Sequence, residues 1–382
     1  MPRALALADD TTGALELGAL CASLGVRARV LLDPAGSPTG DPDVLVIDTR
    51  TRHLTAGRAA DRVRAAASRY RGVPVYKKTD STLRGQIAAE LDALLETVPP
   101  GPLLPGPLVY VPAYPKLGRT VERGILRLDD VPVAETEFAR DLRQPVRESS
   151  VPRLLRKTSA FPVEEISSAG PLAAALRAGG ARILVCDART EQHLAELAAV
   201  WAQRLPRSPA AGPTGFAVHW LRELLQLPAV EVTPARFPAV PAAVAVNGSL
   251  HPRSRGQIDS ARTRLGPLWT FLDARDLPAG SPHAIARELA SRTAAALTAA
   301  GAGTLVVFGG DTAAAVFAEL GVAELTPVGE ILPGVAVSAF AWRGGDWWAI
   351  TKAGGFGPPD LLVRLAAGPT RTARRGTPSL NP

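Results

Sequence analysis

Short runs of apolar and β-branched residues alternate along this chain with longer, alanine-rich amphipathic stretches. In the first half these runs predict strands at the positions 5–8, 26–32, 44–48, 74–77, 108–112 and 182–186. Helices are predicted between most of them, an alternation typical of parallel sheets with crossover helices. Residues 121–150 lack helical periodicity, so we expect a long excursion with a short hairpin there.

The alternation resumes after a proline-rich stretch at residues 206–241, which also holds a short predicted strand at 230–232. Further strands are predicted at 243–246, 269–272, 304–308 and 347–352. We place a boundary near residue 236, between a first domain over 1–235 and a second over 236–366. The last residues, 367–382, are rich in Pro, Gly and Thr and are predicted to be a disordered tail. The fold class is therefore α/β, with two Rossmann-like domains of mainly parallel sheet and an active site in the cleft between them.

Composition narrows the class of protein. Apolar residues make up 46% of the chain, but no apolar run reaches the length of a membrane span, so we expect a cytoplasmic protein with no membrane partner. The net charge of +7 comes mostly from arginines scattered beside glutamates, and we expect no nucleic-acid partner. The two cysteines have no metal-binding spacing, and we expect no metal site made by the protein.

Polar clusters follow four of the predicted strands in the first half, at residues 9–13, 48–52, 77–85 and 113–120. The carboxyl ends of parallel strands meet at one edge of a sheet, which is where ligands bind in open α/β folds. The clusters offer carboxylates, hydroxyls, guanidinium groups and ammonium groups. Such a mixture suits a polyhydroxylated anion, since carboxylates accept from sugar hydroxyls and arginine binds a carboxylate bidentately.

Helix capping is the alternative reading of two of these clusters. Asp80 or Ser81 could cap a helix that starts near Leu83, and the pair after the first strand could cap the first helix. Two adjacent acids also repel each other unless a positive group lies near, which Lys77 or Lys78 could supply. Because residues 77–85 hold two of only five lysines in the chain, a ligand site explains the whole run better than capping does.

Glycine dominates the corresponding positions of the second half. Turns at residues 247–249, 309–312 and 352–357 each follow a predicted strand. Glycines there let backbone N–H groups approach a phosphate, and the N-terminus of the next helix favours negative charge. The chain has neither GxxxxGK[ST] nor a full GxGxxG, so these turns predict a nucleotide site of another kind.

Taken in order, these motifs resemble the four-carbon acid sugar kinase family over about residues 4–365. The motifs are ADDTTGA (8–14), TRTRHL (49–54), KKTDSTLRG (77–85), PAYPKLGRT (112–120), VPVAETEFARD (131–141), NGSLHPRSRGQID (247–259), GGDT (309–312) and KAGGFG (352–357). The resemblance implies two α/β domains, an N-terminal one for the sugar acid and a C-terminal one for ATP. It implies ATP-dependent phosphorylation of threonate, erythronate or an oxidised relative at the terminal hydroxyl, with Mg²⁺.

Carried over motif by motif, the resemblance implies two sets of contacts. Those to the sugar acid come from Asp9, Arg52, Lys78, Asp80, Ser81, Thr82, Leu83 and Arg84. Those to ATP come from Ser249, Gly309, Gly310, Asp311, Thr312, Lys352, Gly354 and Gly355. The final motif departs from the family's usual Lys-Ser-Gly-Asn-Phe-Gly at Ala353 and Gly355, which removes a hydroxyl and an amide.

These contacts suggest a mechanism as a hypothesis. Arg52 and Arg84 would hold the sugar carboxylate while Ser81 and Thr82 bind its hydroxyls. Asp9 or Asp80 would be catalytic, orienting or deprotonating the terminal hydroxyl. Asp311 would reach Mg²⁺ through water.

Two other functions stay open from the sequence. One is an NAD-linked sugar-acid enzyme, against which the missing GxGxxG counts. The other is a non-catalytic sensor that has kept the sugar-acid site, which the changes at residues 353 and 355 make conceivable. A homodimer is our expectation for the assembly, although no sequence motif specifies it.

Overall fold

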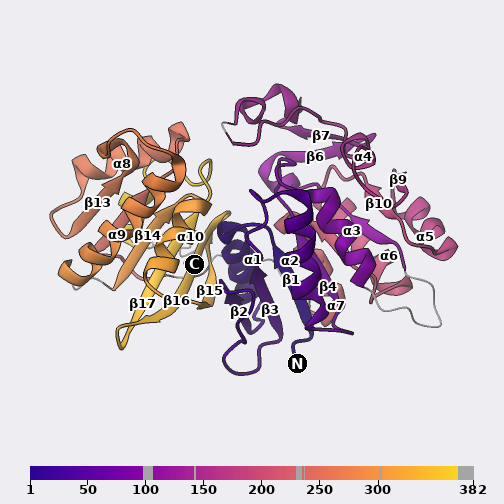
Figure 1. Cartoon of the computed structure of the whole chain (residues 1–382), viewed down its shortest axis with the longest axis horizontal. Coiled ribbons are helices and arrows are strands. Elements are labelled where there is room, and N and C mark those ends of the chain that lie inside the picture. Colours follow the sequence, from indigo (N-terminus) through magenta and orange to yellow (C-terminus); the bar gives the residue numbers. More distant parts are fainter. Residues whose placement is uncertain (98–105, 142, 229–234, 236, 301–302, 369–382) are drawn as a thin grey trace, which may run out of the picture.

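One long sheet of 14 strands runs through both halves of the chain (Figure 1). This computed structural model describes residues 1–97, 106–141, 143–228, 235, 237–300 and 303–368. The strands follow the order β13-β12-β14-β17-β16-β15-β2-β3-β1-β4-β11-β5-β10-β9. The predicted α/β class with mainly parallel strands is confirmed.

The first half contributes eight strands, all parallel to their neighbours within that half. In spatial order they are β2 (Ala28–Leu31), β3 (Val44–Asp48), β1 (Ala4–Ala8), β4 (Val75–Lys78), β11 (Ala210–Gly212), β5 (Leu108–Tyr110), β10 (Ile183–Cys186) and β9 (Val163–Ile166). Its helices are α1 (Thr11–Ser23), α2 (Ala56–Ser68), α3 (Ile87–Thr97), α4 (Val151–Arg156), α5 (Ala169–Ala178), α6 (Glu191–Arg204) and α7 (Thr214–Leu225). Since β1 and β3 are buried along their whole length, their near-continuous apolar runs are what a sheet covered on both faces requires.

The second half combines parallel and antiparallel pairing. Its strands are β12 (Ala243–Asn247), β13 (Trp269–Asp273), β14 (Thr304–Phe308), β15 (Glu324–Leu332), β16 (Val335–Trp342) and β17 (Gly345–Lys352). Its helices are α8 (Pro252–Arg264), α9 (Pro282–Ala300), α10 (Gly310–Glu319) and α11 (Leu361–Ala367). The pairs β12–β13, β12–β14 and β14–β17 are parallel, whereas β15, β16 and β17 form an antiparallel meander.

The two halves join through β15 and α1. Glu324 and Leu325 of β15 pair antiparallel with Leu31 and Val30 of β2, which makes the sheet continuous. Helix α1 packs against β15, β16 and α10 of the second half as well as against its own neighbours, and Figure 1 shows it at the junction. The largest apolar core accordingly draws residues from both halves. The N-terminus of α1 is therefore held against both halves at once.

The expected excursion is a small separate sheet with two 3-10 turns. Strands β6 (Arg119–Glu122), β7 (Ile125–Leu128) and β8 (Val131–Pro132) pair antiparallel, and 3-10 turns follow at Val133–Glu135 and Glu137–Arg140. Figure 1 shows this sheet above the first half. Its far end returns to the carboxyl edge of the main sheet, as described for the site below.

Several elements were missed or misplaced by the sequence interpretation. The proline-rich stretch contains β11 and α7, and β11 lies between β4 and β5 inside the first sheet. The hairpin of β15 and β16 and the α4-β9-α5 segment were also not predicted. The helix expected to start near Leu83 starts instead at Ile87, because the preceding residues form a turn around Asp80.

Three predictions concern residues outside those described: the strand at 230–232, the boundary near 236 and most of the tail, 369–382. The assignment of 1–235 and 236–366 to two domains stays a prediction. None of the helices in the described ranges has the length and apolar character that a membrane crossing needs.

Candidate active site

The carboxyl ends of β1, β3 and β4 bring the acidic and basic residues of three predicted clusters together. Arg52 is the centre of this group. Its Nε and Nη2 donate to the two carboxylate oxygens of Asp9, both at 2.8 Å, and Nη2 also donates to Asp10 at 2.7 Å. Burial alone would raise the pKa of Asp9, but Arg52, with help from Lys77 and Lys78, lowers it. The main neutralising partner of the acidic pair is therefore an arginine, and not a lysine as expected.

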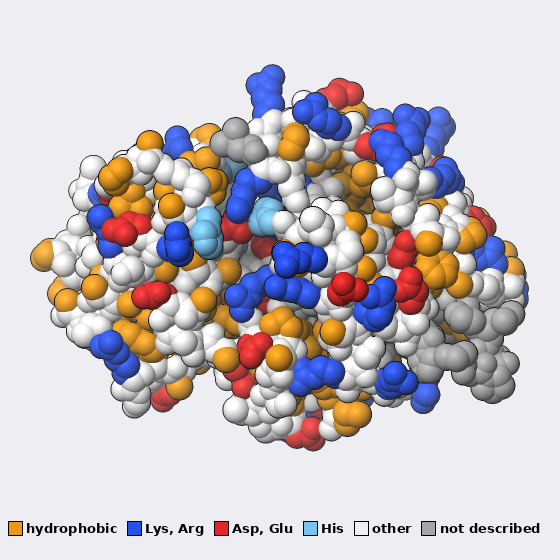
Figure 2. Space-filling view, in the orientation of Figure 1, with side chains coloured by type: hydrophobic (Ala, Val, Ile, Leu, Met, Phe, Trp, Pro, Cys, Tyr) orange, Lys and Arg blue, Asp and Glu red, His pale blue; other side chains and the backbone are white. Residues whose placement is uncertain are grey.

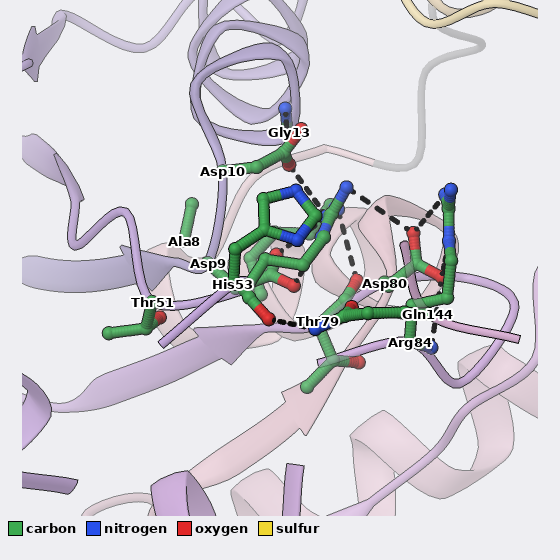
Figure 3. A network of polar contacts seen from close by, with 12 residues as sticks. Ala8, Asp9, Asp10, Gly13, Thr51, His53, Thr79, Asp80, Arg84 and Gln144 are labelled. Atoms are coloured by element: carbon green, nitrogen blue, oxygen red, sulfur yellow. Dashed lines mark hydrogen bonds and ion pairs between the residues drawn. The ribbon is translucent and has the colours of Figure 1, made fainter. Parts of the chain in front are cut away.

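Asp10 is the residue that caps the first helix. Its Oδ1 accepts from the Gly13 N–H at 3.0 Å and its Oδ2 accepts from the Thr12 hydroxyl at 2.6 Å. The capping interpretation of the acidic pair is correct for Asp10, which also joins Asp9 in the ionic network around Arg52. Figure 3 shows Asp9, Asp10 and Asp80 in one connected set of polar contacts.

Asp80 forms the second centre of the site. Its carboxylate accepts from Arg84 Nη2 at 2.8 Å and Nε at 3.1 Å, and also from the Thr82 N–H and hydroxyl. Arg52 Nη1 lies 3.5 Å away. Burial would raise the pKa of Asp80, but Arg84 and Arg52 lower it well below its usual range. Asp80 therefore shapes its own loop and does not cap α3.

The loop after β4 is held in an unusual backbone conformation. Leu83 has a φ of 68° and is buried, a combination rare for a bulky residue and frequent at functional sites. Ser81, in the same loop, is half-buried. Lys78 is buried, donates to the Thr79 carbonyl at 3.0 Å, and lies so near α1 that a Cβ on Gly13 would be 2.9 Å from its Nζ. The loop thus keeps one lysine beside the start of α1.

A buried ion pair under the site was not anticipated. Lys77 Nζ lies 3.2 Å from Glu90 Oε1, both side chains are almost fully buried, and Glu90 also accepts from the Thr51 hydroxyl. Glu90 is a charged residue among apolar neighbours on α3, and that contrast is the sequence signal that could have revealed it. Burial raises its pKa. This buried pair supports the site residues and keeps the Lys77 ammonium bound to the Glu90 carboxylate.

The end of the excursion closes over this network. Asp141 Oδ2 accepts from Arg84 Nη1 at 3.1 Å, and Gln144 Nε2 donates to the carbonyl of Arg52. Arg143, between them, forms an ion pair with Asp311 of the second half. Figure 2 shows basic, acidic and histidine side chains gathered on this face where the halves meet. One short segment therefore contacts both halves.

The predicted nucleotide turn at residues 309–312 lies directly against the first half. A Cβ on Gly310 would be 2.6 Å from Asp10 Oδ2 and 3.1 Å from the Thr12 hydroxyl oxygen. Gly309 has a φ of 103°, so it turns the chain from β14 into α10 in a conformation that favours glycine. Asp311, in the first turn of α10, also lies 3.3 Å from the His53 ring nitrogen. Two of the predicted motifs, one from each half, therefore meet here.

The other two turns of the second half pack on each other. The Ser249 hydroxyl accepts from the His251 N–H at 3.2 Å, and a Cβ on Gly354 would be 2.7 Å from the same hydroxyl. Thr312 packs so closely on Gly248 that a side chain there would collide with its hydroxyl. Gly355 lies beside His251, where an added Cβ would be 3.3 Å from Nε2. An open hollow of about 430 Å³ adjoins them, lined by His251, Pro252, Arg253, Gly256 and Pro359.

Lys352 points into the protein from the end of β17. Its Nζ donates to Ser254 Oγ at 3.0 Å, to the Gly354 carbonyl at 2.9 Å and to the Ala353 carbonyl at 3.2 Å. Burial, together with Arg253, lowers its pKa to about 7. Lys352 was predicted to contact the nucleotide. In the structure its hydrogen bonds hold the glycine turn from the buried side.

Two known protein families match parts of this chain. Residues 4–220 match the family described as "Sugar-binding N-terminal domain" and residues 274–362 match "Nucleotide-binding C-terminal domain". A Bordetella bronchiseptica protein named D-threonate kinase is 30% identical over 94% of this chain and 96% of its own length. A Burkholderia multivorans protein named 3-oxo-tetronate kinase is 28% identical over 93% and 95%.

Solved structures share the fold. A Salmonella typhimurium protein superposes with a TM-score of 0.76 over 94% of this chain and 98% of its own, at 23% identity. A Bordetella bronchiseptica protein, crystallised with bound citrate as a domain-swapped dimer, gives a TM-score of 0.51 over 96% and 98%, at 28% identity.

The fold and the two matched regions define a protein that joins a sugar-binding half to a nucleotide-binding half. Together with the named relatives, they show that this chain belongs to the four-carbon acid sugar kinase family.

Proposed function

We propose that this chain transfers the γ-phosphoryl group of ATP to the terminal hydroxyl of a four-carbon sugar acid. The observation that carries the proposal is the meeting of Asp10, a member of the polar network, with Gly310, at the start of α10. Sugar acid and nucleotide bound to these two parts would lie next to each other. Relatives named D-threonate kinase and 3-oxo-tetronate kinase support the substrate class.

The first half would bind the sugar acid. Arg84 keeps 25% of its side chain exposed and Arg52 keeps 11%, so of the two Arg84 is the more accessible to a substrate carboxylate. Ser81 and Thr82 would bind the hydroxyls, and Lys78 and Leu83 would complete the wall of the site. The relative crystallised with citrate supports an anionic ligand of this type.

Asp9 and Asp80 are the proposed catalytic carboxylates, and their bonding favours orientation of the hydroxyl over strong proton abstraction. Both oxygens of each one accept hydrogen bonds from arginine. A carboxylate with a lowered pKa is a weak base. Phosphoryl transfer passes through a loose transition state and depends on positioning and charge neutralisation, so a weak base suffices.

The second half would bind ATP. Ser249, the turn Gly309 to Thr312, and Gly354 with Gly355 would surround its phosphates, because backbone N–H groups at a helix N-terminus favour anions. Lys352 would act through the shape of its turn. Closure of the halves would exclude water, which would otherwise hydrolyse ATP.

Mg²⁺ is the metal expected with ATP, and the residues present fit it. Protein sites for Mg²⁺ use one or two carboxylates together with substrate phosphates. Asp10 and Asp311 flank Gly310 and provide such oxygens, while the described residues contain no cluster of three or more metal-binding side chains. When bound, the ion would neutralise part of the phosphate charge.

Release of ADP tests the proposal. Purified protein is assayed with Mg·ATP against D- and L-threonate, D- and L-erythronate and their 3-oxo forms. Turnover with at least one acid, lost in Asp80→Ala and kept in the exposed control Asp61→Ala, supports the proposal. Binding of a sugar acid without turnover or ATP binding would instead indicate a sensor. Size-exclusion chromatography with light scattering tests the homodimer we also propose.

A further inference from the structure

Most cations of the site are already paired with carboxylates. Arg52 binds Asp9 and Asp10, Arg84 binds Asp80 and Asp141, and Lys77 binds Glu90, each at 3.2 Å or less. Lys78 and Arg119 differ, because within the described part of the chain neither forms an ion pair, and Lys78 donates to the Thr79 carbonyl. The Nη1 of Arg119 donates only to the Leu117 carbonyl, and its buried Nε has no partner among the described residues.

Backbone hydrogen bonds hold the main chain of Arg119 in place. Residues 114–119 form a closed loop, in which the Tyr114 N–H donates to the Arg119 carbonyl at 2.7 Å and the Arg119 N–H donates back at 3.1 Å. Gly118 completes this loop with a φ of 72°. Arg119 is the first residue of β6 and its main chain is fixed by these bonds, while its side chain is held by the Leu117 carbonyl.

The guanidinium of Arg119 faces the nucleotide-binding half. It lies 5.8 Å from the ring centre of Phe356, in the glycine turn that Lys352 shapes. Burial lowers the pKa of Arg119, opposed by the charge of Asp80 and other acids. Arg119 thus contacts the turn at residues 352–357 through Phe356 and feels the charge of the Asp80 carboxylate.

A guanidinium that is charged, partly buried and without a carboxylate is costly unless an anion completes its hydrogen bonds. Arginine also presents a planar fork that matches the oxygens of a phosphoryl group. From this position and this unmet hydrogen-bonding capacity, we propose that Arg119 contacts the phosphoryl group while it passes from ATP to the sugar acid. The inference rests on the function proposed above.

In the transfer, the bond between the γ-phosphorus and the bridging oxygen breaks and its electron pair stays with ADP. The bond between the substrate's terminal oxygen and phosphorus forms, and the hydroxyl proton leaves to solvent. Arg119 would neutralise charge on the equatorial oxygens during this step. A sugar carboxylate is the other anion it could meet, but its contact with Phe356 of the nucleotide-binding half favours the phosphoryl group.

The test compares the variants Arg119→Ala and Arg119→Lys with the control Arg127→Ala. Arg127 lies on β7, the strand paired with β6, and its side chain donates to the Asp130 carbonyl. We expect kcat of Arg119→Ala to fall about 100-fold or more, with KM for both substrates within about threefold. Arg119→Lys keeps the charge but not the fork and should recover part of the rate. Arg127→Ala should match the wild type.

A binding measurement gives a second readout. Calorimetry follows tetrafluoroaluminate, a planar phosphoryl mimic, added to protein with Mg·ADP, with and without D-threonate. Arg119→Ala should weaken binding of the mimic at least about tenfold while ADP affinity stays within about twofold.

Unchanged kcat and unchanged binding of the mimic in Arg119→Ala would overturn the inference. A raised KM for the sugar acid at constant kcat would also overturn it and assign Arg119 to the carboxylate. If Arg119→Ala does not fold, Arg119→Lys carries the same comparisons. If the wild type phosphorylates no acid, the proposed function fails, yet the mimic still tests Arg119.

Discussion

A ring nitrogen of His53 lies 3.3 Å from the carboxylate of Asp311, and the contact joins the two halves of the molecule. Arg143 binds the same carboxylate from the excursion. Asp311 belongs to the turn proposed to bind nucleotide, so a phosphate entering there would lie near the same three side chains. If this turn binds nucleotide as proposed, the contact would couple nucleotide binding to the approach of the two halves.

Loss of this contact should loosen the approach of the two halves with little effect on stability. Asp311 is 51% exposed and His53 36%, and exposed pairs contribute only about 0–1 kcal/mol. In Asp311→Asn we expect a larger radius of gyration by small-angle scattering and a free energy of unfolding within about 1 kcal/mol of wild type.

The double variant His53→Gln, Arg143→Gln breaks the same contacts from the other side. If Asp311 also serves the nucleotide, Asp311→Asn should weaken ATP binding about fivefold more than the double variant does, a coupling of about 1 kcal/mol. Equal ATP affinities would show that Asp311 acts only as an interdomain contact.

Asp80→Asn should damage both stability and activity. The substitution leaves Arg84 and Arg52 without the charge that Asp80 provides, and breaking a buried pair on one side costs about 3–5 kcal/mol. Urea unfolding should show a loss of about 3 kcal/mol, and ADP release should fall about 100-fold or more. The control Asp61→Asn alters an exposed pair with Arg64 and should cost less than about 0.5 kcal/mol. A stable but inactive Asp80→Asn would separate catalysis from folding.

Glu330 predicts a pH dependence of stability. Burial, with the charge of Glu16 and against that of Lys116, raises its pKa to about 8. A carboxyl group whose pKa is higher in the folded state than in the unfolded state stabilises the fold while it is protonated. This stabilisation is complete below the unfolded pKa of about 4.5 and is lost as the pH rises through the folded pKa of about 8. The stability of wild type relative to Glu330→Gln should therefore fall by about 1 kcal/mol or more from pH 4.5 to pH 8.5. A rise over that range in urea unfolding would contradict the assignment.

Lys352→Met should weaken ATP binding without affecting the sugar acid. The variant fills the same space but loses the ammonium that donates to Ser254 and to the carbonyls of Ala353 and Gly354. We expect the Kd for ATP to rise about tenfold, the equivalent of roughly one to two hydrogen bonds, while the Kd for the sugar acid stays constant. Unaltered ATP affinity by calorimetry would mean that the turn keeps its shape without the lysine.

Sequence patterns predicted the long, buried elements well because their signals are local. β1, β3 and β14 are almost entirely apolar runs, and α1 begins at a polar cap. By contrast, β11 reads Ala-Ala-Gly and has no β-branched residue. It is a strand because β4 and β5 flank it on both sides, which is a tertiary effect.

The sequence predicted many residues of the candidate site, but few of the contacts between them. The cluster after β4 was singled out, yet its pairing with Arg52 depends on the order of β3, β1 and β4 in the sheet. The arrival of Asp141 and Gln144 from the excursion depends on a fold that local patterns do not specify. Arg119 lay within a quoted motif but had no assigned role, because its missing partner is visible only in three dimensions.

Identification of the product with phosphorus and carbon NMR, after incubation with Mg·ATP and each ¹³C-labelled four-carbon acid, is the most direct test of the kinase activity. We expect ADP and a new phosphate ester whose phosphorus couples to the terminal carbon of one acid. ADP with free phosphate and unaltered acid would indicate hydrolysis instead. No consumption of ATP with any acid would contradict the proposed kinase activity.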